Sequence, residues 1–219
     1  MKPGKCRTAA FFDVDRTLLK KTTSSFIITE LHKRGIIRLK DILRFNYYLI
    51  LHRLNLINIE KVRKTVEFLK KERKAYAEKL IKDVFDTRIK QFIPKIMIYE
   101  VKYHRKMGHM VILVSGAPEI MIHHFKDFLK ADIIESTLLE IKNGVYTGKI
   151  KKLCYGSEKV RSIKSLIKSR KIDMKNSYFY SDSFSDMPMF QMVGNRIAVN
   201  PDFKLKSYAK NHGWRIIDY

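Results

Sequence analysis

The 219-residue sequence is poor in several residue types, and each shortage narrows what the protein can be. Two cysteines, Cys6 and Cys154, are too few for a disulfide framework and have no metal-ligand spacing, so we expect buried or idle thiols. The longest apolar stretch is interrupted by His52 and Arg53, so no run reaches the ~18 to 20 apolar residues of a membrane span. The N-terminus lacks the apolar core of a signal peptide, and we therefore expect a cytoplasmic protein.

Acidic residues are also scarce, because 22 Asp and Glu stand against 45 Lys and Arg for a formal net charge of +23. Residues 20–90 carry 19 basic and 8 acidic side chains, so this segment is more basic than the rest of the chain. Such a field attracts anionic substrates, acidic lipid headgroups or nucleic acid. Lysines spread over solvated helix faces would give the same composition, and the sequence leaves both interpretations open.

The chain instead has many short β-rich runs that alternate with helix-patterned segments. We expect strands at 8–14, 110–115, 131–136, 177–181, 196–200 and 214–219. Helices are expected at 95–107, 118–129, 158–170 and 186–193. An Asn-Gly pair at Asn143 and Gly144 predicts a hairpin over 139–148. This alternation predicts an α/β domain with a mainly parallel sheet.

The segment from about Thr22 to Phe92 has a different character. It contains no proline and one glycine, Gly35, and its helical periodicity falls into four pieces, at 24–34, 39–54, 59–69 and 74–90. Pro94 marks the return to the sheet domain. We therefore expect a helical-bundle cap, residues 22–92, inserted after the first strand of a core formed by residues 1–21 and 93–219.

Polar side chains follow three of the predicted strands. Asp13, Ser115 and Asp182 each come at the end of an apolar run, and the carboxyl ends of parallel strands meet at one crevice. A carboxylate that attacks phosphorus must have its charge neutralised, and Mg²⁺ held by oxygen ligands does this. Asp13 and Asp182 can supply the carboxylates. The pattern predicts a metal-assisted phosphoryl-transfer site.

Each of the remaining polar residues fits a step of that chemistry. With Asp13 forming an acyl-phosphate, Asp15 is placed to protonate the departing alkoxide and then to deprotonate the hydrolytic water. Ser115 can donate to a phosphoryl oxygen, and Gly116 allows close approach of the backbone. Lys159, near a helix start, can neutralise charge in the transition state. Asp13 or Ser115 alone is more easily explained as a helix cap or turn former, and one lysine in so basic a chain is nearly uninformative. Helix capping explains one of Asp182 and Asp186 but hardly both, and the combination favours catalysis.

These residues resemble the four signature motifs of the haloacid dehalogenase superfamily, in its phosphoserine-phosphatase-like branch. The motifs are the DxDxT loop at 13–17, the Ser after the second strand, the Lys, and the paired acids Asp182 and Asp186. The resemblance implies a Rossmann-like, doubly wound, mainly parallel sheet with an inserted helical-bundle cap. It covers essentially the whole chain.

The resemblance also implies a role for each site residue. Asp13 would be the nucleophile, Asp15 the general acid and base, and Ser115 with Lys159 the phosphate ligands. The implied Mg²⁺ site consists of the Asp13 carboxylate, the Asp15 carbonyl and Asp182, with Asp186 supporting it.

One position departs from the family pattern. True phosphoserine phosphatases carry a Glu nine residues after the nucleophile that helps bind the amino-acid part of the substrate, and here that residue is Thr22, beside Lys20 and Lys21. The missing carboxylate argues against phosphoserine as the substrate. Arg16 stands where many relatives have Gly, and we expect its side chain to point outward.

Three functions are compatible with these observations. The favoured one is a Mg²⁺-dependent phosphomonoester hydrolase that acts through an aspartyl-phosphate on a small phosphorylated metabolite. The second is the same chemistry at an anionic membrane surface, of the phosphatidylglycerophosphatase type, because the basic cap is rich in apolar residues around 45–56 that a core-facing helix would otherwise bury. The third, a basic nucleic-acid-binding protein on a hydrolase scaffold, rests on charge and tyrosines alone and has no supporting motif. Neither the substrate nor the oligomeric state follows from the sequence.

Overall fold

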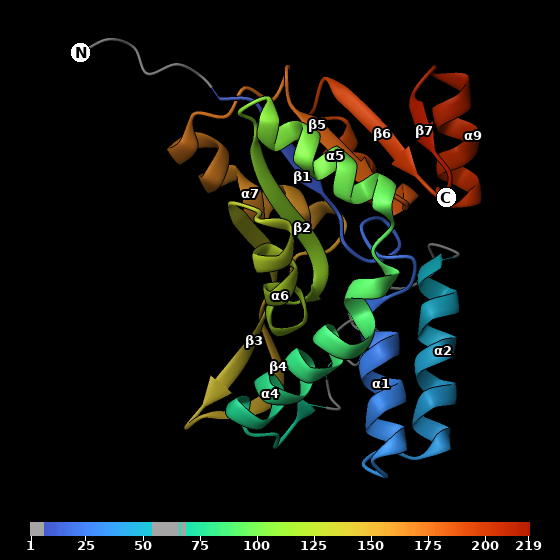
Figure 1. Ribbon diagram of the computed structural model, residues 1–219, viewed down its shortest axis with the longest axis vertical. Coiled ribbons are helices and arrows are strands. Elements are labelled where there is room, and N and C mark those ends of the chain that lie inside the picture. The colour runs from blue at the N-terminus through green and yellow to red at the C-terminus, as the bar shows by residue number, and fades with distance from the viewer. Residues whose placement is uncertain (1–6, 54–65, 67–68) are drawn as a thin grey trace.

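A computed structural model describes residues 7–53, 66 and 69–219 and places a seven-stranded sheet at the centre of the molecule (Figure 1). The strand order is β4-β3-β2-β1-β5-β6-β7, and every neighbouring pair is parallel except β3 and β4. The strands are β1 (Ala9–Phe12), β2 (Met110–Pro118), β3 (Ile133–Lys142), β4 (Val145–Lys152), β5 (Tyr178–Ser181), β6 (Asn195–Val199) and β7 (Arg215–Ile217). The expected mainly parallel sheet is confirmed.

Helices cover both faces of this sheet. They are α1 (Thr23–Lys33), α2 (Leu39–Arg53), α4 (Lys74–Val84), α5 (Lys95–Lys106), α6 (Glu119–Leu129), α7 (Ser157–Arg170), α8 (Met187–Phe190) and α9 (Phe203–Asn211). Alternate residues of β1 separate the two faces, because successive strand side chains point in opposite directions. Ala10 and Phe12 pack with residues of α5 and α6, whereas Ala9 and Phe11 pack with residues of α7, α8 and α9.

Helices α1, α2 and α4 come between β1 and β2 and lie below the sheet in Figure 1. The entry and exit of this insertion lie side by side, because the backbone N–H of Lys20 donates to the Phe92 carbonyl oxygen at 3.1 Å. Ile27 of α1 and Ile81 of α4 belong to the same apolar cluster as Phe125 of α6. The insertion thus packs onto the core, and its limits as a domain, 22–92, remain a prediction.

Several element boundaries differ from the expected ones. The expected helix over 59–69 lies mostly outside the described residues. Helix α4 ends at Val84 and continues as one π-helical turn, Phe85–Ile89, and a 3₁₀ turn, Lys90–Phe92. The helical start expected at 186 is instead a 3₁₀ turn, Phe184–Asp186, ahead of α8. Helix α9 was not predicted, although Asp202 caps it by accepting a hydrogen bond from the Leu205 N–H at 2.9 Å.

Two expectations drawn from scarce residue types can be compared with the structure. No helix in the described part of the chain is long and apolar enough to cross a membrane. The Cys154 thiol is fully buried, and burial raises its pKa to about 11, as expected of a structural thiol. Cys6 lies outside the described residues.

Candidate active site

Lys159 lies at the centre of the site and joins two distant segments. It sits in the first turn of α7 and is 3% exposed, and its Nζ donates to Asp13 Oδ1 and to Asp186 Oδ2, both at 2.7 Å. Burial alone would lower the pKa of Lys159, but the two carboxylates outweigh it and raise the pKa above its usual value. The ammonium group therefore stays charged at the point where Asp13 and Asp186 approach each other.

Asp13 directly follows β1 and continues its pairing with β5, because its N–H donates to the Tyr180 carbonyl oxygen at 2.9 Å. The side chain is buried, and burial raises its carboxyl pKa to about 7; Lys159 opposes this shift, whereas the negative charge of Asp186 adds to it. Oδ1 is fixed by Lys159, and the hydrogen bonds of the described residues do not engage Oδ2. One carboxylate oxygen is thus oriented while the other can face a substrate.

Asp15 is held by the beginning of the inserted segment. The N–H of Thr23, the first residue of α1, donates to Asp15 Oδ1 at 2.7 Å, and Thr23 Oγ1 lies 3.4 Å from Oδ2. Burial raises the pKa of Asp15, and these hydrogen bonds from Thr23 oppose the shift. The carboxyl group lies close enough to Asp13 and Lys159 to interact with their charges. The candidate acid and base thus connects the core to α1.

The loop after β1 is closed by backbone bonds and not by the threonine hydroxyl. The Leu19 N–H donates to the Val14 carbonyl at 3.0 Å, which closes the turn. Thr17 is fully buried, but its Oγ1 has no hydrogen-bond partner among the described residues. The Thr17 carbonyl instead accepts a hydrogen bond from the hydroxyl of Tyr219. Tyr219 was absent from the predicted site, and nothing in its sequence position points to this contact.

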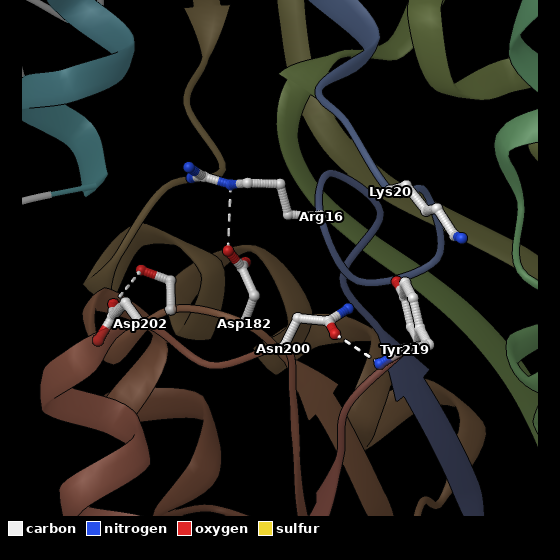
Figure 2. A pocket seen from close by; sticks show the side chains of 7 residues that line it. Arg16, Lys20, Asp182, Asn200, Asp202 and Tyr219 are labelled. Atoms are coloured by element: carbon white, nitrogen blue, oxygen red, sulfur yellow. Dashed lines mark hydrogen bonds and ion pairs between the residues drawn. The ribbon is translucent and has the colours of Figure 1, made fainter.

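Arg16 points into the site, so the expectation of an outward-pointing side chain is wrong. Its backbone has a φ of 62°, in the left-handed region, and its Nε lies 3.1 Å from Asp182 Oδ2 (Figure 2). Burial raises the pKa of Asp182 well above its usual range, with Arg16 opposing the shift and the negative charges of Asp13 and Asp186 adding to it. A second cation thus faces the carboxylates from the DxDxT loop.

The Asp186 side chain is directed to Lys159 and to the end of β5. Its Oδ2 accepts hydrogen bonds from Lys159 Nζ at 2.7 Å and from Ser181 Oγ at 2.6 Å. Ser181 is fully buried at the end of β5 and was absent from the predicted site. Its position directly before Asp182, on the same strand end, was the available signal. Asp186 is therefore arranged to orient the lysine.

Ser115 and Gly116 lie near the carboxyl end of β2, the strand beside β1. Ser115 is 1% exposed, and its Oγ accepts a hydrogen bond from the Ala117 N–H at 3.2 Å. A Cβ on Gly116 would lie 3.4 Å from the Tyr155 ring, so this backbone does pass close to the segment before α7. No hydrogen bond among the described residues joins Ser115 to Asp13 or Lys159, and their common role stays a prediction.

The charges of this cluster fit a divalent cation. Asp13, Asp15, Asp182 and Asp186 supply four carboxylates against the two cations Lys159 and Arg16, which leaves two uncompensated negative charges if all four are ionised. The described residues contain no group of three or more His, Cys, Asp or Glu side chains in metal-binding geometry. Asp186 is bound by both Lys159 and Ser181, and Asp15 is bound by Thr23, whereas Asp13 and Asp182 each have one oxygen that no hydrogen bond or ion pair of the described residues engages. Two carboxylates completed by water and substrate phosphate suit Mg²⁺.

A parallel sheet whose carboxyl ends gather buried carboxylates around a lysine is the arrangement of an α/β enzyme. A model of the haloacid dehalogenase-like hydrolase family matches residues 10–191, which is most of the chain, and the protein belongs to this family. The matched segment runs from β1 to just beyond α8 and contains every site residue that the sequence predicted. The resemblance seen in the sequence is confirmed.

Similarity to known proteins extends over nearly the whole chain. The inhibition of morphological differentiation protein of Streptomyces azureus is 28% identical over 97% of this chain and 79% of its own length. A phosphoserine phosphatase of Mycobacterium tuberculosis is 28% identical over 99% of this chain and 72% of its own length. A probable phosphatase of the same species is 25% identical over 98% of this chain and 76% of its own length.

Solved structures share the fold at low sequence identity. A protein of unknown function from Bordetella pertussis superimposes with a TM-score of 0.86 at 22% identity and covers 98% of this chain and 99% of its own. A phospho-aspartyl intermediate analogue of phosphoserine phosphatase superimposes with a TM-score of 0.74 at 24% identity and covers 97% of this chain and 94% of its own. These likenesses confirm the Rossmann-like α/β fold.

Proposed function

We propose that this protein is a Mg²⁺-dependent phosphomonoester hydrolase that acts through an aspartyl-phosphate on a small phosphorylated metabolite. The observation that carries the proposal is the pair of 2.7 Å bonds by which Lys159 ties Asp13 to Asp186 at the carboxyl ends of the strands. Membership of a hydrolase family and similarity to proteins named as phosphatases support the same reaction class.

In the first step, Asp13 attacks the phosphorus atom through its outward oxygen. A bond forms between Asp13 Oδ2 and phosphorus while the bond from phosphorus to the ester oxygen breaks. Asp15 delivers its proton to the departing alkoxide, for which its raised pKa suits it. Lys159 remains charged and offsets the negative charge that builds up on the phosphoryl oxygens.

In the second step, Asp15 takes a proton from a water molecule, whose oxygen attacks the acyl-phosphate and displaces the Asp13 carboxylate as phosphate forms. The Thr23 N–H and hydroxyl keep Asp15 in place for both transfers. Mg²⁺ held by Asp13, Asp182 and the Asp15 carbonyl, when bound, supplies the positive charge that lets a carboxylate approach a phosphate dianion.

The substrate we propose is not phosphoserine. Thr22, at the position of the amino-acid-binding Glu, is buried, and its Oγ1 accepts a hydrogen bond from the Ser25 N–H at 3.3 Å as the cap of α1. Its hydroxyl is committed to that helix and carries no charge. An ammonium group of the substrate would find no counter-charge there.

Purified protein tests the proposal. We expect release of inorganic phosphate from members of a phosphomonoester panel with Mg²⁺ and none with EDTA, and hydroxylamine should trap an acyl-phosphate. Asp13→Asn should abolish both signals, whereas Asp127→Asn, whose side chain is 72% exposed, should retain them. Full activity in Asp13→Asn would rule out the mechanism, and no phosphate release from any ester would rule out the function.

A second candidate places this chemistry at an anionic membrane surface. Four large apolar side chains of α2, spaced to share one helix face, are between 55% and 62% exposed: Leu39, Leu43, Tyr47 and Ile50. The surrounding segment, residues 20–90, carries a net charge of +11, which complements acidic headgroups. None of the relatives described above is named as a lipid phosphatase or a nucleic-acid-binding protein. We propose surface attachment through α2 only as an addition to the metabolite reaction.

Vesicle sedimentation tests this attachment. We expect the protein to bind phosphatidylglycerol vesicles at low salt and to bind phosphatidylcholine vesicles much less. The double variant Leu43→Ser, Tyr47→Ser should lose binding, whereas Phe203→Ser, which removes an 89% exposed apolar side chain from α9, should keep it. Equal binding of the double variant, or a stable dimer that the double variant disrupts, would rule out the lipid surface as the partner of α2.

A further inference from the structure

The loop that follows β5 carries the two acidic residues of the last motif, Asp182 and Asp186. The pairing of β5 with β6 ends at Ser181 and Ala198, so other contacts must fix the residues beyond it. Both acids are buried, Asp182 at 7% exposed and Asp186 at 2%. Because Asp182 is a proposed metal ligand and Asp186 orients Lys159, the site depends on how this loop is held.

Asp202 holds this loop at successive residues. Its backbone N–H donates to the Asp182 carbonyl oxygen at 2.8 Å, and its Oδ2 accepts a hydrogen bond from the Phe184 N–H, also at 2.8 Å. The Ser183 hydroxyl, 3.4 Å from the same oxygen, adds a weaker contact (Figure 2). Residues 182–184 are thus all bound by one residue from the segment between β6 and α9.

The Asp202 carboxylate is a support and not a further ligand position. Its second oxygen, Oδ1, accepts a hydrogen bond from the Leu205 N–H at 2.9 Å in the first turn of α9. In Figure 2 the carboxylate points away from the ion pair of Arg16 and Asp182. Helix α9 is itself anchored, because Leu205 and Ala209 are fully buried in the core. One side chain therefore ties the loop to a fixed helix.

A displacement of residues 182–184 would move both acids. The Asp186 N–H donates to the Ser183 carbonyl oxygen at 3.1 Å, so the 3₁₀ turn that ends at Asp186 begins in the segment that Asp202 holds. Residues that orient a metal ligand affect affinity strongly, and loss of one such partner typically weakens metal binding by ~10- to 100-fold.

We propose that Asp202 is a positioning residue that sets the place of the Asp182 carboxylate and thereby the affinity for Mg²⁺. The inference rests on the metal site of the proposed function, and Asp202 lies beyond residues 10–191, which match the family model. Asp202, Asp182 and Ser183 line a cavity of about 300 Å³. The loop therefore borders open space on one side, where packed side chains do not restrain it, and its support comes from Asp202.

Two substitutions of Asp202 separate this role from helix capping. Serine caps a helix as well as aspartate does, but its single side-chain oxygen cannot also bind the Phe184 N–H, whereas alanine makes neither contact. In Asp202→Ser we expect the Kd for Mg²⁺, measured by calorimetric titration without ester, to rise about tenfold. Asp202→Ala should raise this Kd by the same factor. It should also lower the Tm by about 2 to 4 °C more than Asp202→Ser does, because the α9 cap is lost as well.

Hydrogen exchange and a matched control distinguish positioning from an effect of charge alone. The amides of residues 182–186 should exchange faster in Asp202→Ser than in the wild type, because the loop is less restrained. Asp173→Ser removes the same charge from the loop before β5, where Asp173 Oδ1 accepts a hydrogen bond from the Lys175 N–H at 3.0 Å. This control should change neither the Kd for Mg²⁺ nor the exchange of 182–186. An unchanged Kd in Asp202→Ser would overturn the assignment, as would a raised Kd with unchanged exchange of the loop.

Activity measurements separate this inference from the proposed function. Asp202 acts on metal affinity, so saturating Mg²⁺ should restore the kcat of Asp202→Ser to within about threefold of wild type for every ester that is hydrolysed. A deeper loss at saturating Mg²⁺ would overturn the positioning role. If the wild type binds Mg²⁺ but releases no phosphate from any ester, the function fails, and the Kd values still decide the inference. A wild-type protein that binds no Mg²⁺ would overturn the inference together with the metal site.

Discussion

The molecule contains two charged networks, each built around a buried charged side chain and each in contact with β5. Their difference shows what makes such a network catalytic. Lys159 joins Asp13 and Asp186 beyond the carboxyl ends of β1 and β5. On the α5 side of the sheet, Glu100 accepts hydrogen bonds from the Tyr180 hydroxyl at 2.8 Å and from both terminal nitrogens of Arg215 at 3.0 and 2.5 Å. Both oxygens of Glu100 are bound in this way, whereas Asp13 keeps one carboxylate oxygen that no hydrogen bond of the described residues engages.

The first network lies at the strand ends, where the charges of Asp13 and Asp186 act on Asp182, a residue that lines a cavity. The second is sealed on the sheet side, because Phe12 stacks on Tyr180 with ring centres 4.3 Å apart, and His104 closes it with its Nε2 2.8 Å from the Tyr180 hydroxyl. A buried charge alone therefore does not identify a catalytic group. A catalytic group is identified by its position at the crevice where parallel strands end.

The largest expected effect is on activity, through Lys159. Lys159→Met should lower kcat by about 10³-fold or more. The reason is that removing a preorganised charge at a phosphoryl-transfer site should lower kcat at least as much as removing one hydrogen-bond donor from an oxyanion hole does. Phosphate release at saturating ester measures it. Lys206→Met, which breaks an exposed lysine pair with Asp218 at 3.1 Å, is the control and should stay within about twofold of wild type. A comparable loss in both variants would remove the special role of Lys159.

The second expected effect is on stability, through Glu100. Glu100→Gln keeps the shape but removes the charge that Arg215 and Tyr180 hydrogen-bond, which should cost about 2 kcal/mol and lower Tm by roughly 4 to 8 °C. Scanning calorimetry measures the shift. Activity well below Tm should remain within about threefold of wild type, and a loss as deep as that of Lys159→Met would contradict the comparison.

A further control sharpens this stability prediction. Glu135→Gln removes a carboxylate that bonds Lys152 at 2.6 Å in a more exposed position, so it should cost less than 1 kcal/mol. The order of the two Tm shifts, with Glu100→Gln the larger, is the expected outcome. The reverse order would show that the Glu100 network contributes little to stability.

The third expected effect is a pH dependence of stability from His104. Burial lowers its pKa from 6.5 to about 4, with His109 adding to the shift and Glu100 opposing it. Below pH 6.5 the unfolded chain binds a proton that the folded protein does not, so the free energy of unfolding should fall as the pH drops from 6.5 towards 4. His104→Gln should flatten this slope in urea titrations between pH 7.5 and 4.5. Some slope should remain, because burial also lowers the pKa values of His109 and His124.

The smallest expected effect links the chain end to the catalytic loop. Tyr219→Phe removes the hydroxyl that donates to the Thr17 carbonyl, which should cost about 1 kcal/mol of stability and lower kcat roughly threefold. Steady-state kinetics and calorimetry measure both. Tyr99→Phe, at a 63% exposed position of α5, is the control and should change neither.

Much of the fold was predictable because its signals are local. Apolar runs predicted β1, β2, β5 and β6. The Asn143-Gly144 turn lies between β3 and β4, as expected. Helix α9, which was not predicted, also has a local signal, its Asp202 cap. Chain order around the strands therefore sufficed to predict a parallel α/β sheet.

The candidate site was predictable in its members but not in its contacts. The residue types and spacings identified Asp13, Asp182 and Lys159, but not that Asp186 would turn to Lys159 or that Arg16 would turn inward to Asp182. A side chain's direction depends on the space and charge around it, which distant segments create. For the same reason the contact between Tyr219 and the Thr17 carbonyl does not follow from the sequence.

The sequence by itself determined the reaction class. The order and spacing of the DxDxT loop and of the later serine, lysine and aspartates are enough to identify it. Tertiary structure alone decided which charges neutralise each other and which face open space. Lys20 and Lys21 are adjacent and chemically identical, yet one lines the cavity and the other covers Phe92. The physical reason is that an electrostatic contact depends on distance through space, and folding sets that distance independently of distance along the chain.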